Sequence, residues 1–552
     1  MKRQKISYFV IMFCLVVNLS GCGYFNISVP DQSTEPFSVE QEVNAPLPID
    51  ITLEIPVEYQ IDFTDPVPER LLSELTILES NGKLQATGEI SLLYSTEEDG
   101  IANWIYVAAT AFSNLVDVIE VDELLALWKG NPINEKWTRI YIQESDLAVL
   151  KMKFGLPDAS FVKTITPELA LSTAWQEPDA LFILAFEQLE PRWKVLKFNN
   201  DSIFSRPFVA SEYPLNFSYV FNSDMIEINK AIETPITNYD QRKMSSVLMT
   251  GVTALVRATG AKMESEGFVY PASTIQEVLL DADITHISNE VSFAEDCPPS
   301  NAYQENIMFC SRPEYFELLT YADIDLVELS GNHLKDWSNA AFDFSLQLYD
   351  DAGVATYSGG INQLDAREPY KIELNGNKLA FLGCNPAGPP NVWATDTLSG
   401  VANCEDDWLL YEVQALAADG YLPIVTMQHY ETYAMLPNLE QKTDFLKLSA
   451  NGAVIVSGSQ AHFPQAMTFI GDHFIHYGLG NLFFDQMDIP VVGTRREFLD
   501  RHVFYDGQYI QTELYTAMLE DFSRPRIMTE EERLDFLEDI FTASNWIKSE
   551  DK

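Results

Sequence analysis

Apolar runs of strand length alternate with helical patterns along residues 51–238. The run Asn103–Ala109 is almost continuously apolar, which predicts a buried strand. Residues Asp122–Trp128 have the periodicity of a helix, with Asp122 placed to cap it and Gly130 just past its end. The repeated order of strand and then helix predicts an α/β module.

Residues 245–505 also carry apolar strands, and polar loops follow several of them. The predicted strands are Val247–Gly251, Asp325–Ser330, Leu422–Met427 and Val454–Val456, and the predicted helices are Asn339–Ala352 and Leu439–Ala450. Side chains at the ends of core strands are where α/β folds build sites. Residues 506–552 are expected to form a tail, in which Thr529–Glu532 is a capping box that opens an amphipathic helix packed on the body.

The start of the chain predicts export. Three basic residues precede the apolar run Tyr8–Val17, and the small residues Ser20 and Gly21 precede Cys22. Residues 1–22 therefore resemble a lipoprotein signal peptide, which implies a lipid on Cys22; an ordinary signal peptide is the alternative. Residues 23–50 have the composition of a flexible tether. We expect a lipoprotein on the outer face of the cytoplasmic membrane or the cell surface, in contact with the membrane through this anchor alone.

Size and charge narrow the function. A chain of 552 residues exceeds one hydrophobic core, so two or more domains are expected. The balance of 35 basic against 82 acidic residues gives a net charge of −47. Such a surface repels nucleic acid and argues against tight electrostatic capture of a polyanion.

Four cysteines lie in the expected exported body, where an oxidising compartment favours disulfides. Four cysteines allow three pairings, and a zinc site is a weak alternative because there is no C-x-x-C pair. Their sequential spacings of 13 and 20 residues favour short loops. We predict the pairs Cys297–Cys310 and Cys384–Cys404.

Five polar loops carry the candidate chemistry. They are Asn289–Glu290, Gly331–His333, the loop at His429, Gly458–His462 and Gly478–Asn481. Together they supply a carboxylate, amides and three imidazoles, which suit Zn, Mn or Fe at a hydrolytic site. A single buried histidine is more often a structural residue. The ordered set of three histidines with a carboxylate and amides favours a functional site.

These loops resemble the motifs of the CapA family of poly-γ-glutamate capsule proteins, relatives of the calcineurin-like metallophosphoesterases. The matching segments are Val327–His333, Val425–Tyr433, Gly458–Gln465 and His476–Asp485. The resemblance covers nearly half of the chain. It implies a four-layer αββα metallophosphoesterase-like sandwich, two mixed sheets face to face with helices outside.

Two departures from the family weaken its metal centre. The opening Asp is replaced by Val252, and the first His of the late loop is replaced by Gln460. The resemblance implies one metal held by the opening Asp, Glu290 and His462. It implies a second metal held by four residues, namely Glu290, Asn332, His429 and position 460. At most one weakly bound Zn or Mn is therefore expected.

What remains of the family site is still polar. The expected roles are His333 as a general acid, Glu290 as a base or single-metal ligand, and Arg257 as a partner of a carboxylate. We expect the site residues to meet in one pocket, with Val252 and Gln460 facing it.

The first module resembles phosphate-type periplasmic substrate-binding proteins. The segments that carry the resemblance are Val121–Gly130, Ala180–Glu190 and Tyr213–Leu215. It implies a periplasmic-binding-protein-like α/β domain with a small anionic ligand between two lobes. The usual Ser/Thr-Gly phosphate loop is not evident, so a retained scaffold or docking domain is the alternative.

Three functions follow in order. The first is a surface lipoprotein that acts in poly-γ-glutamate or related polymer biosynthesis, retention or turnover, with a polymer or γ-glutamyl peptide as partner. The second is a non-catalytic surface protein that binds a small anion or peptide. The third is a degenerate metal-dependent hydrolase of the calcineurin-like superfamily. The net charge of −47 argues against the first function, because a polyanionic polymer would need a local positive site, such as Arg257, or a bridging cation in order to bind.

Overall fold

The structure is a computed structural model of the chain. It describes residues 61–62, 65–80, 90–95, 100–221, 236–459, 461–488 and 492–548. Glu58–Lys552 forms one compact unit that holds all of them. The expected signal peptide with Cys22, the tether and Gln460 lie outside the described residues. In the described ranges, no helix has the length and apolar character needed to cross a membrane.

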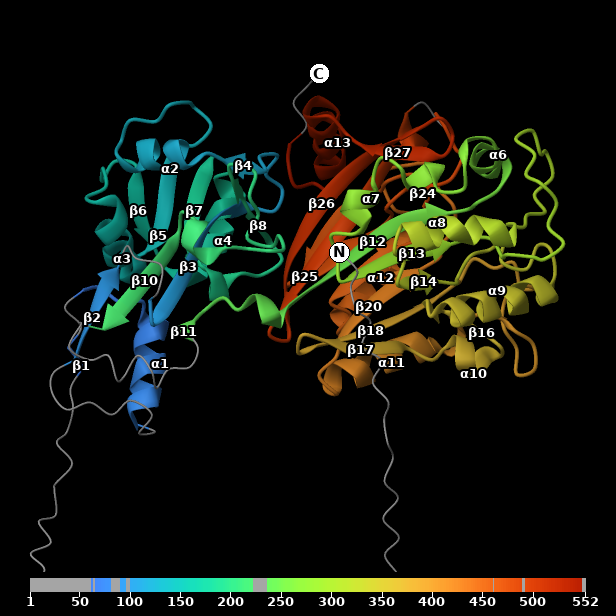
Figure 1. Cartoon of the computed structure of the whole chain (residues 1–552), viewed down its shortest axis with the longest axis horizontal. Coiled ribbons are helices and arrows are strands. Elements are labelled where there is room, and N and C mark those ends of the chain that lie inside the picture. Colours follow the sequence, from blue (N-terminus) through green and yellow to red (C-terminus); the bar gives the residue numbers. More distant parts are fainter. Residues whose placement is uncertain are drawn as a thin grey trace, which may run out of the picture. The chain divides into compact units, whose positions relative to one another are not determined.

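Residues up to 237 build one mixed sheet (Figure 1). In the described part of the chain it has nine strands, in the order β1 (Ile61–Asp62), β2 (Ile90–Ser95), β10 (Asn216–Phe221), β3 (Ala102–Ala111), β7 (Ala180–Ala185), β5 (Arg139–Gln143) and β6 (Val162–Ile165), with β8 (Trp193–Val195) and β11 (Ile236–Thr237) paired to β3. Strands β4 (Val118–Ile119) and β9 (Lys197–Phe198) pair with each other. The helices are α1 (Glu69–Ser80), α2 (Val121–Trp128), α3 (Glu144–Phe154) and α4 (Pro167–Gln176). The alternation of strands and helices confirms the predicted α/β module.

The expected strand and helix at the start of this module are both present, with one correction. Strand β3 contains the apolar run Asn103–Ala109 and is buried along almost its whole length. Helix α2 is capped by Glu120 and not by Asp122, so the predicted cap is wrong. Glu123 accepts a hydrogen bond from the Glu120 backbone N–H at 3.0 Å, because the third helical residue reaches back over the first turn.

Residues from 244 onward build two further sheets. The larger has the order β15 (Ala355–Tyr357), β14 (Leu326–Glu328), β13 (Ile284–Asn289), β12 (Met244–Thr253), β25 (Arg496–Tyr505), β26 (Gln508–Glu520) and β27 (Arg524–Ile527), with β24 (Asn481–Phe483) on β12. The smaller has the order β17 (Tyr370–Leu374), β18 (Asn377–Cys384), β20 (Leu422–Met427), β21 (Ile455–Gly458), β23 (His473–His476) and β22 (Met467–Ile470). Strands β16 (Gly359–Gly360) and β19 (Gly400–Val401) form a separate pair.

Eight helices accompany these sheets in the residues that the structure describes. They are α6 (Arg257–Glu266), α7 (Gln276–Leu279), α8 (Phe316–Tyr321), α9 (Asn339–Ala352), α10 (Gln363–Ala366), α11 (Trp408–Ala418), α12 (Leu439–Ala450) and α13 (Glu530–Ala543). The predicted bounds of α9, α12 and β20 agree with the structure residue for residue.

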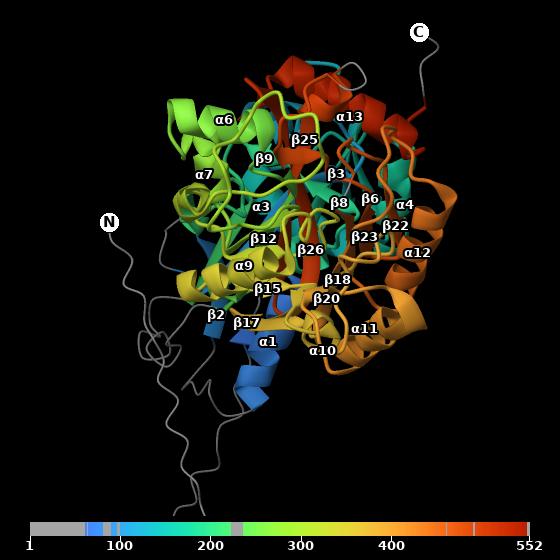
Figure 2. The ribbon, with the colours of Figure 1, turned by 90° about the vertical axis from the view of Figure 1, so that its right-hand side faces the viewer.

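Three apolar clusters define the layers of this part. One cluster joins the two sheets face to face, with Met249 and Phe498 from the larger sheet and Phe381 and Phe474 from the smaller. A second packs the larger sheet against α6–α9, and a third packs the smaller sheet against α11 and α12. Figure 2 shows α6 and α9 on one flank of the strands and α11 and α12 on the other. The predicted four-layer αββα sandwich is confirmed.

The chain after Tyr505 differs from the expected tail. Strand β26 follows β25 through a tight hairpin and pairs with it along nearly its full length, and β27 adds to the same sheet. Residue 505 is therefore the end of a hairpin strand and not a domain boundary, because β26 buries its apolar residues in the sandwich. The predicted capping box is present, with Thr529 and Glu532 bonded to each other's backbone.

Both predicted disulfides are present. Cys297 is bonded to Cys310, and Cys384 is bonded to Cys404. The first closes the loop that ends in Phe309, and the second joins the end of β18 to the segment before α11.

Candidate functional site

The polar loops leave the carboxyl ends of parallel strands in the two sheets. Strands β12, β13 and β14 are parallel, as are β18, β20 and β21. Glu290 directly follows β13, and its backbone N–H donates to the carbonyl of Thr253 at 2.9 Å. A Cβ atom on Gly331 would lie 2.6 Å from the Glu290 Cα, so only glycine permits this approach. The loop with Asn332 and His333 is thereby held against Glu290.

His462 faces two carboxylates. Its Nε2 lies 3.8 Å from an oxygen of Glu290 and 3.8 Å from an oxygen of Glu431. Its Nδ1 donates to the Asn481 Oδ1 at 2.8 Å, and its ring stacks on Phe484 with centroids 5.0 Å apart. The Asn481 bond and the stacked ring fix the imidazole, so Nε2 is directed at the carboxylates.

His333 is held by Asp336, three residues later. The two side chains approach to 2.6 Å at His333 Nδ1, and the same Asp336 oxygen accepts the backbone N–H of Phe309 at 3.2 Å. Burial lowers the pKa of His333, but the bond to Asp336 and the charges of Glu290, Asp336 and Glu431 outweigh it, so this pKa is raised. His333 therefore belongs to the same electrostatic cluster as Glu290 and Glu431.

Arg257 is engaged within the chain. Its guanidinium donates to Asp485, whose other oxygen accepts the backbone N–H of Ala258 at 3.1 Å. The guanidinium also lies over the rings of Phe309 and Phe484, at 5.3 and 5.0 Å from their centroids. Within the chain, the carboxylate that pairs with Arg257 is that of Asp485, and its expected role toward a substrate stays a prediction.

Asn332 and His429 are turned to other partners. Asn332 accepts a hydrogen bond from the side chain of Gln428 at 3.0 Å. The neighbouring His429 is buried and directs Nε2 at Asp444 of α12, 3.3 Å away. Its Nδ1 is buried and has no hydrogen-bond partner among the described residues. Hence Gln428, and not His429, makes the side-chain contact with Asn332.

The described side chains do not fit a resident metal. Val252 is buried, donates its N–H to the Gly480 carbonyl at 3.0 Å and lies opposite Asn481, the partner of His462. Where residues are described, no group of three or more His, Cys, Asp or Glu side chains is placed to hold a metal ion. We therefore derive no chemical step through a metal, and the expected weak Zn or Mn stays a prediction.

Three residues that help to form the site were not predicted from the sequence. Asp336 orients His333, Glu431 faces His462, and Phe309 contacts the His333 ring edge-on at 4.9 Å. The spacing of three residues after His333 was a signal for Asp336. No sequence pattern predicted a role for Phe309, which the Cys297–Cys310 disulfide holds beside the site.

A fourth missed residue, Glu328, lies fully buried beneath the site at the end of β14. Its Oε1 accepts the hydroxyl of Ser330 at 2.5 Å and that of Ser459 at 2.9 Å. Ser330 begins the loop of Asn332 and His333, and Ser459 begins the loop of His462. Glu328 therefore ties the two loops to each other. A charged residue inside an apolar strand was the available signal.

A cavity of about 450 Å³ in the first module lies at the carboxyl ends of β5 and β6. Its lining includes Glu69 and Glu144, together with the polar residues at the first turns of α3 and α4, and among the residues that the structure describes it contains no Lys or Arg. Two carboxylates without a cation do not favour the small anion that the resemblance implies.

The comparisons with known proteins bear on residues 246–486. These residues match the family model described as bacterial capsule synthesis protein PGA_cap. The capsule biosynthesis protein CapA of Bacillus anthracis is 21% identical over 286 residues, which are 50% of this chain and 69% of that protein.

Two solved structures are similar to parts of the chain. An ABC-type phosphate transport receptor from Vibrio cholerae has a TM-score of 0.26 at 10% identity, covering 32% of this chain and 94% of its own. A 5′-nucleotidase precursor from Thermus thermophilus has a TM-score of 0.31 at 11% identity, covering 55% and 58%. Likenesses of this size carry no argument about function. The family match is the stronger finding: residues 246–486 are similar to the bacterial capsule synthesis protein family, which supports the CapA resemblance that their motifs predicted.

Proposed function

We propose that this chain acts on a γ-glutamyl polymer at the cell surface and that His333 is the proton donor of its site. The family match supports a role in capsule polymer metabolism. The observation that carries the chemical part is the contact of 2.6 Å between His333 Nδ1 and Asp336. It leaves Nε2 of His333 for a substrate.

Cleavage of an amide bond needs two proton transfers. The leaving nitrogen must gain a proton, and the attacking water must lose one. The raised pKa of His333 keeps its imidazole protonated at higher pH, so it can protonate the nitrogen. Glu290, next to His462, is placed to accept the proton of the water. The donor and acceptor roles are thus divided between His333 and Glu290.

The charges of the site restrict how such a polymer approaches. Glu290, Glu431 and Asp336 surround the two histidines, and Arg257 is already paired with Asp485. These carboxylates repel the free carboxylates of a polyglutamate chain. They suit its amide nitrogen or its terminal ammonium, so we place the end of a chain, and not its middle, at this site.

The test is an assay on the purified chain. Incubation with poly-γ-glutamate should release new amino groups, and His333→Gln should lower the rate by roughly 100-fold or more. The matched control is His473→Gln, because His473 lies on β23 and bonds to the Ser449 carbonyl away from the site. Polymer binding without any release of amines by the natural chain would contradict the catalytic part and favour retention.

Export and anchoring through Cys22 belong to the same proposal. The basic, apolar and small residues before Cys22 support it. In the native host, Cys22→Ser should move the protein from the membrane fraction to the soluble fraction, as immunoblotting of the two fractions would show. A variant that stays with the membrane would mean that a different part of the chain makes the attachment.

A further inference from the structure

A second, smaller cavity lies away from the candidate site. It has a volume of about 250 Å³ and is bordered by β8 and β9 on one side and by β26 and α13 on the other. Its charged lining consists of Lys194, Lys197, Arg533, Asp117 and Glu513. Three cations against two carboxylates is unusual in a chain of net charge −47, so this spot can attract an anion.

Most of these charges already have partners. Asp117 accepts Lys194 at 2.5 Å and Arg533 at 2.7 Å. Burial raises the pKa of Asp117, but these two cations outweigh it and hold the pKa well below its usual range. Glu513 is bonded to Arg501 at 2.5 Å, outside the cavity lining. The two carboxylates of the cavity are thus neutralised.

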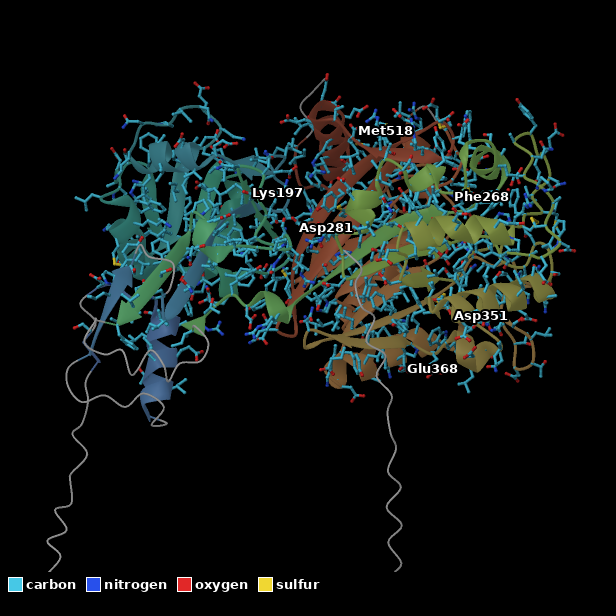
Figure 3. All side chains as sticks on the ribbon, viewed as in Figure 1. Lys197, Phe268, Asp281, Asp351, Glu368 and Met518 are labelled. Carbon is cyan, nitrogen blue, oxygen red and sulfur yellow. A yellow bond between two sulfur atoms is a disulfide. The ribbon has the colours of Figure 1, made fainter. Side chains whose placement is uncertain are left out.

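Lys197 is the cation left over. Across the described residues it makes no salt bridge, and its Nζ lies 5.8 Å from the ring centroid of Tyr515. Asp281, labelled with Lys197 in Figure 3, lies 3.9 Å from Arg501. Burial raises the pKa of Asp281, and the charges of Arg501 and Lys197 oppose this rise without a direct contact from Lys197. The Lys197 ammonium group lies over the Tyr515 ring and beside carboxylates that are already paired with other cations. It can therefore form an ion pair with the carboxylate of a ligand.

Gln511 adds an unsatisfied acceptor to the same cavity. Its side chain is buried, and its Nε2 donates to the Thr512 carbonyl at 3.0 Å. Its Oε1 is buried without a hydrogen-bond partner in the part of the chain that the structure describes. A buried acceptor without a donor is costly, so a turn of the Gln511 side chain that brings this oxygen to the cavity surface is favoured when a bound molecule supplies an N–H or O–H.

We propose that this cavity binds a small amino acid or γ-glutamyl fragment. Its carboxylate pairs with Lys197, its N–H group donates to Gln511 Oε1, and its methylene groups contact Phe112, Leu514 and Tyr515. The volume is below that of ordinary drug-sized sites, which limits the ligand to about one or two residues. This site does not depend on the chemistry proposed for His333 and Glu290.

Calorimetry with the full chain tests the proposal, with L-glutamate as the probe. L-Glutamate should bind, and Lys197→Gln and Gln511→Leu should each weaken binding by about tenfold or more. Lys163→Gln is the matched control, because Lys163 is an exposed lysine on β6 of the same module and donates to the carbonyl of Ala159, which precedes that strand. Thermal melting of each variant separates loss of the site from loss of the fold.

Two further ligands distinguish the chemistry. Glutarate has both carboxylates but no nitrogen, so it should bind more weakly than L-glutamate by about tenfold. Inorganic phosphate should bind more weakly than L-glutamate, because it offers no methylene groups to the apolar wall. The assignment would be overturned if glutarate bound as tightly as L-glutamate, if phosphate bound more tightly than L-glutamate, or if L-glutamate gave no binding heat.

Discussion

Replacing Glu328 with alanine is expected to lower the free energy of unfolding by about 2–4 kcal/mol. The hydroxyls of Ser330 and Ser459 lose their shared acceptor, and a cavity is left in a fully buried position. Because these serines begin the loops of His333 and His462, the variant should also loosen the candidate site. Chemical denaturation followed by tryptophan fluorescence measures the first effect.

The pH dependence gives this prediction a second readout. Burial raises the pKa of Glu328 from its ordinary value of 4.5, although hydroxyls such as those of Ser330 and Thr426 oppose the shift. The folded state therefore keeps a proton that the unfolded state releases. The contribution of Glu328 to stability is present below the unfolded pKa and is lost as pH rises through the folded pKa. Glu328→Gln has no such proton, so its stability should fall less between about pH 5 and about pH 8.

An exposed glutamate provides the control. Glu440 lies on the outer face of α12, and Glu440→Ala should change the unfolding free energy by less than about 0.5 kcal/mol. A Glu328→Ala variant as stable as the natural chain would show that the two loops are held without this carboxyl group. An unaltered pH slope in Glu328→Gln would show that Glu328 is ionised in the folded protein.

The second large effect concerns the rate of amide cleavage as pH is raised. If His333 is the acid, the rate falls as pH rises through its raised pKa, because the neutral imidazole has no proton to give at the leaving nitrogen. Asp336→Asn removes a carboxylate that raises this pKa, so the fall should begin at lower pH. Above that point the variant should lose on the order of 100-fold in rate. A pH–rate profile of both proteins measures it.

Asp444→Asn is the matched control for this profile. Asp444 stands beside His429 as Asp336 stands beside His333, with an oxygen 3.3 Å from Nε2. It should leave the pH–rate profile unchanged. A shift caused by Asp444→Asn, with none from Asp336→Asn, would identify His429 as the acid and would reassign the site.

The amino-acid pattern predicted the elements well where local signals agree with burial. Helix α9 runs from Asn339 to Ala352 as its periodicity indicated, with Ser338 capping its start and Gly353 at its end. The family resemblance implied that the loops of Glu290, His333 and His462 meet. The first two loops follow neighbouring parallel strands of the larger sheet, and the third follows β21 of the smaller sheet. Both disulfide pairs also followed from their short spacing.

By itself, then, the sequence determined the α/β class and the loops from which the candidate site is drawn, and its resemblance to the CapA family implied the sandwich. Only the tertiary structure decided the partner of each side chain. His429 turns to Asp444 on α12, Arg257 is paired with Asp485, and Glu328 joins two loops that are far apart in the chain through Ser330 and Ser459. The chain after residue 505 likewise became strands of the sheet. Such choices depend on side-chain direction and on the packing of distant elements, which a pattern along one chain does not contain.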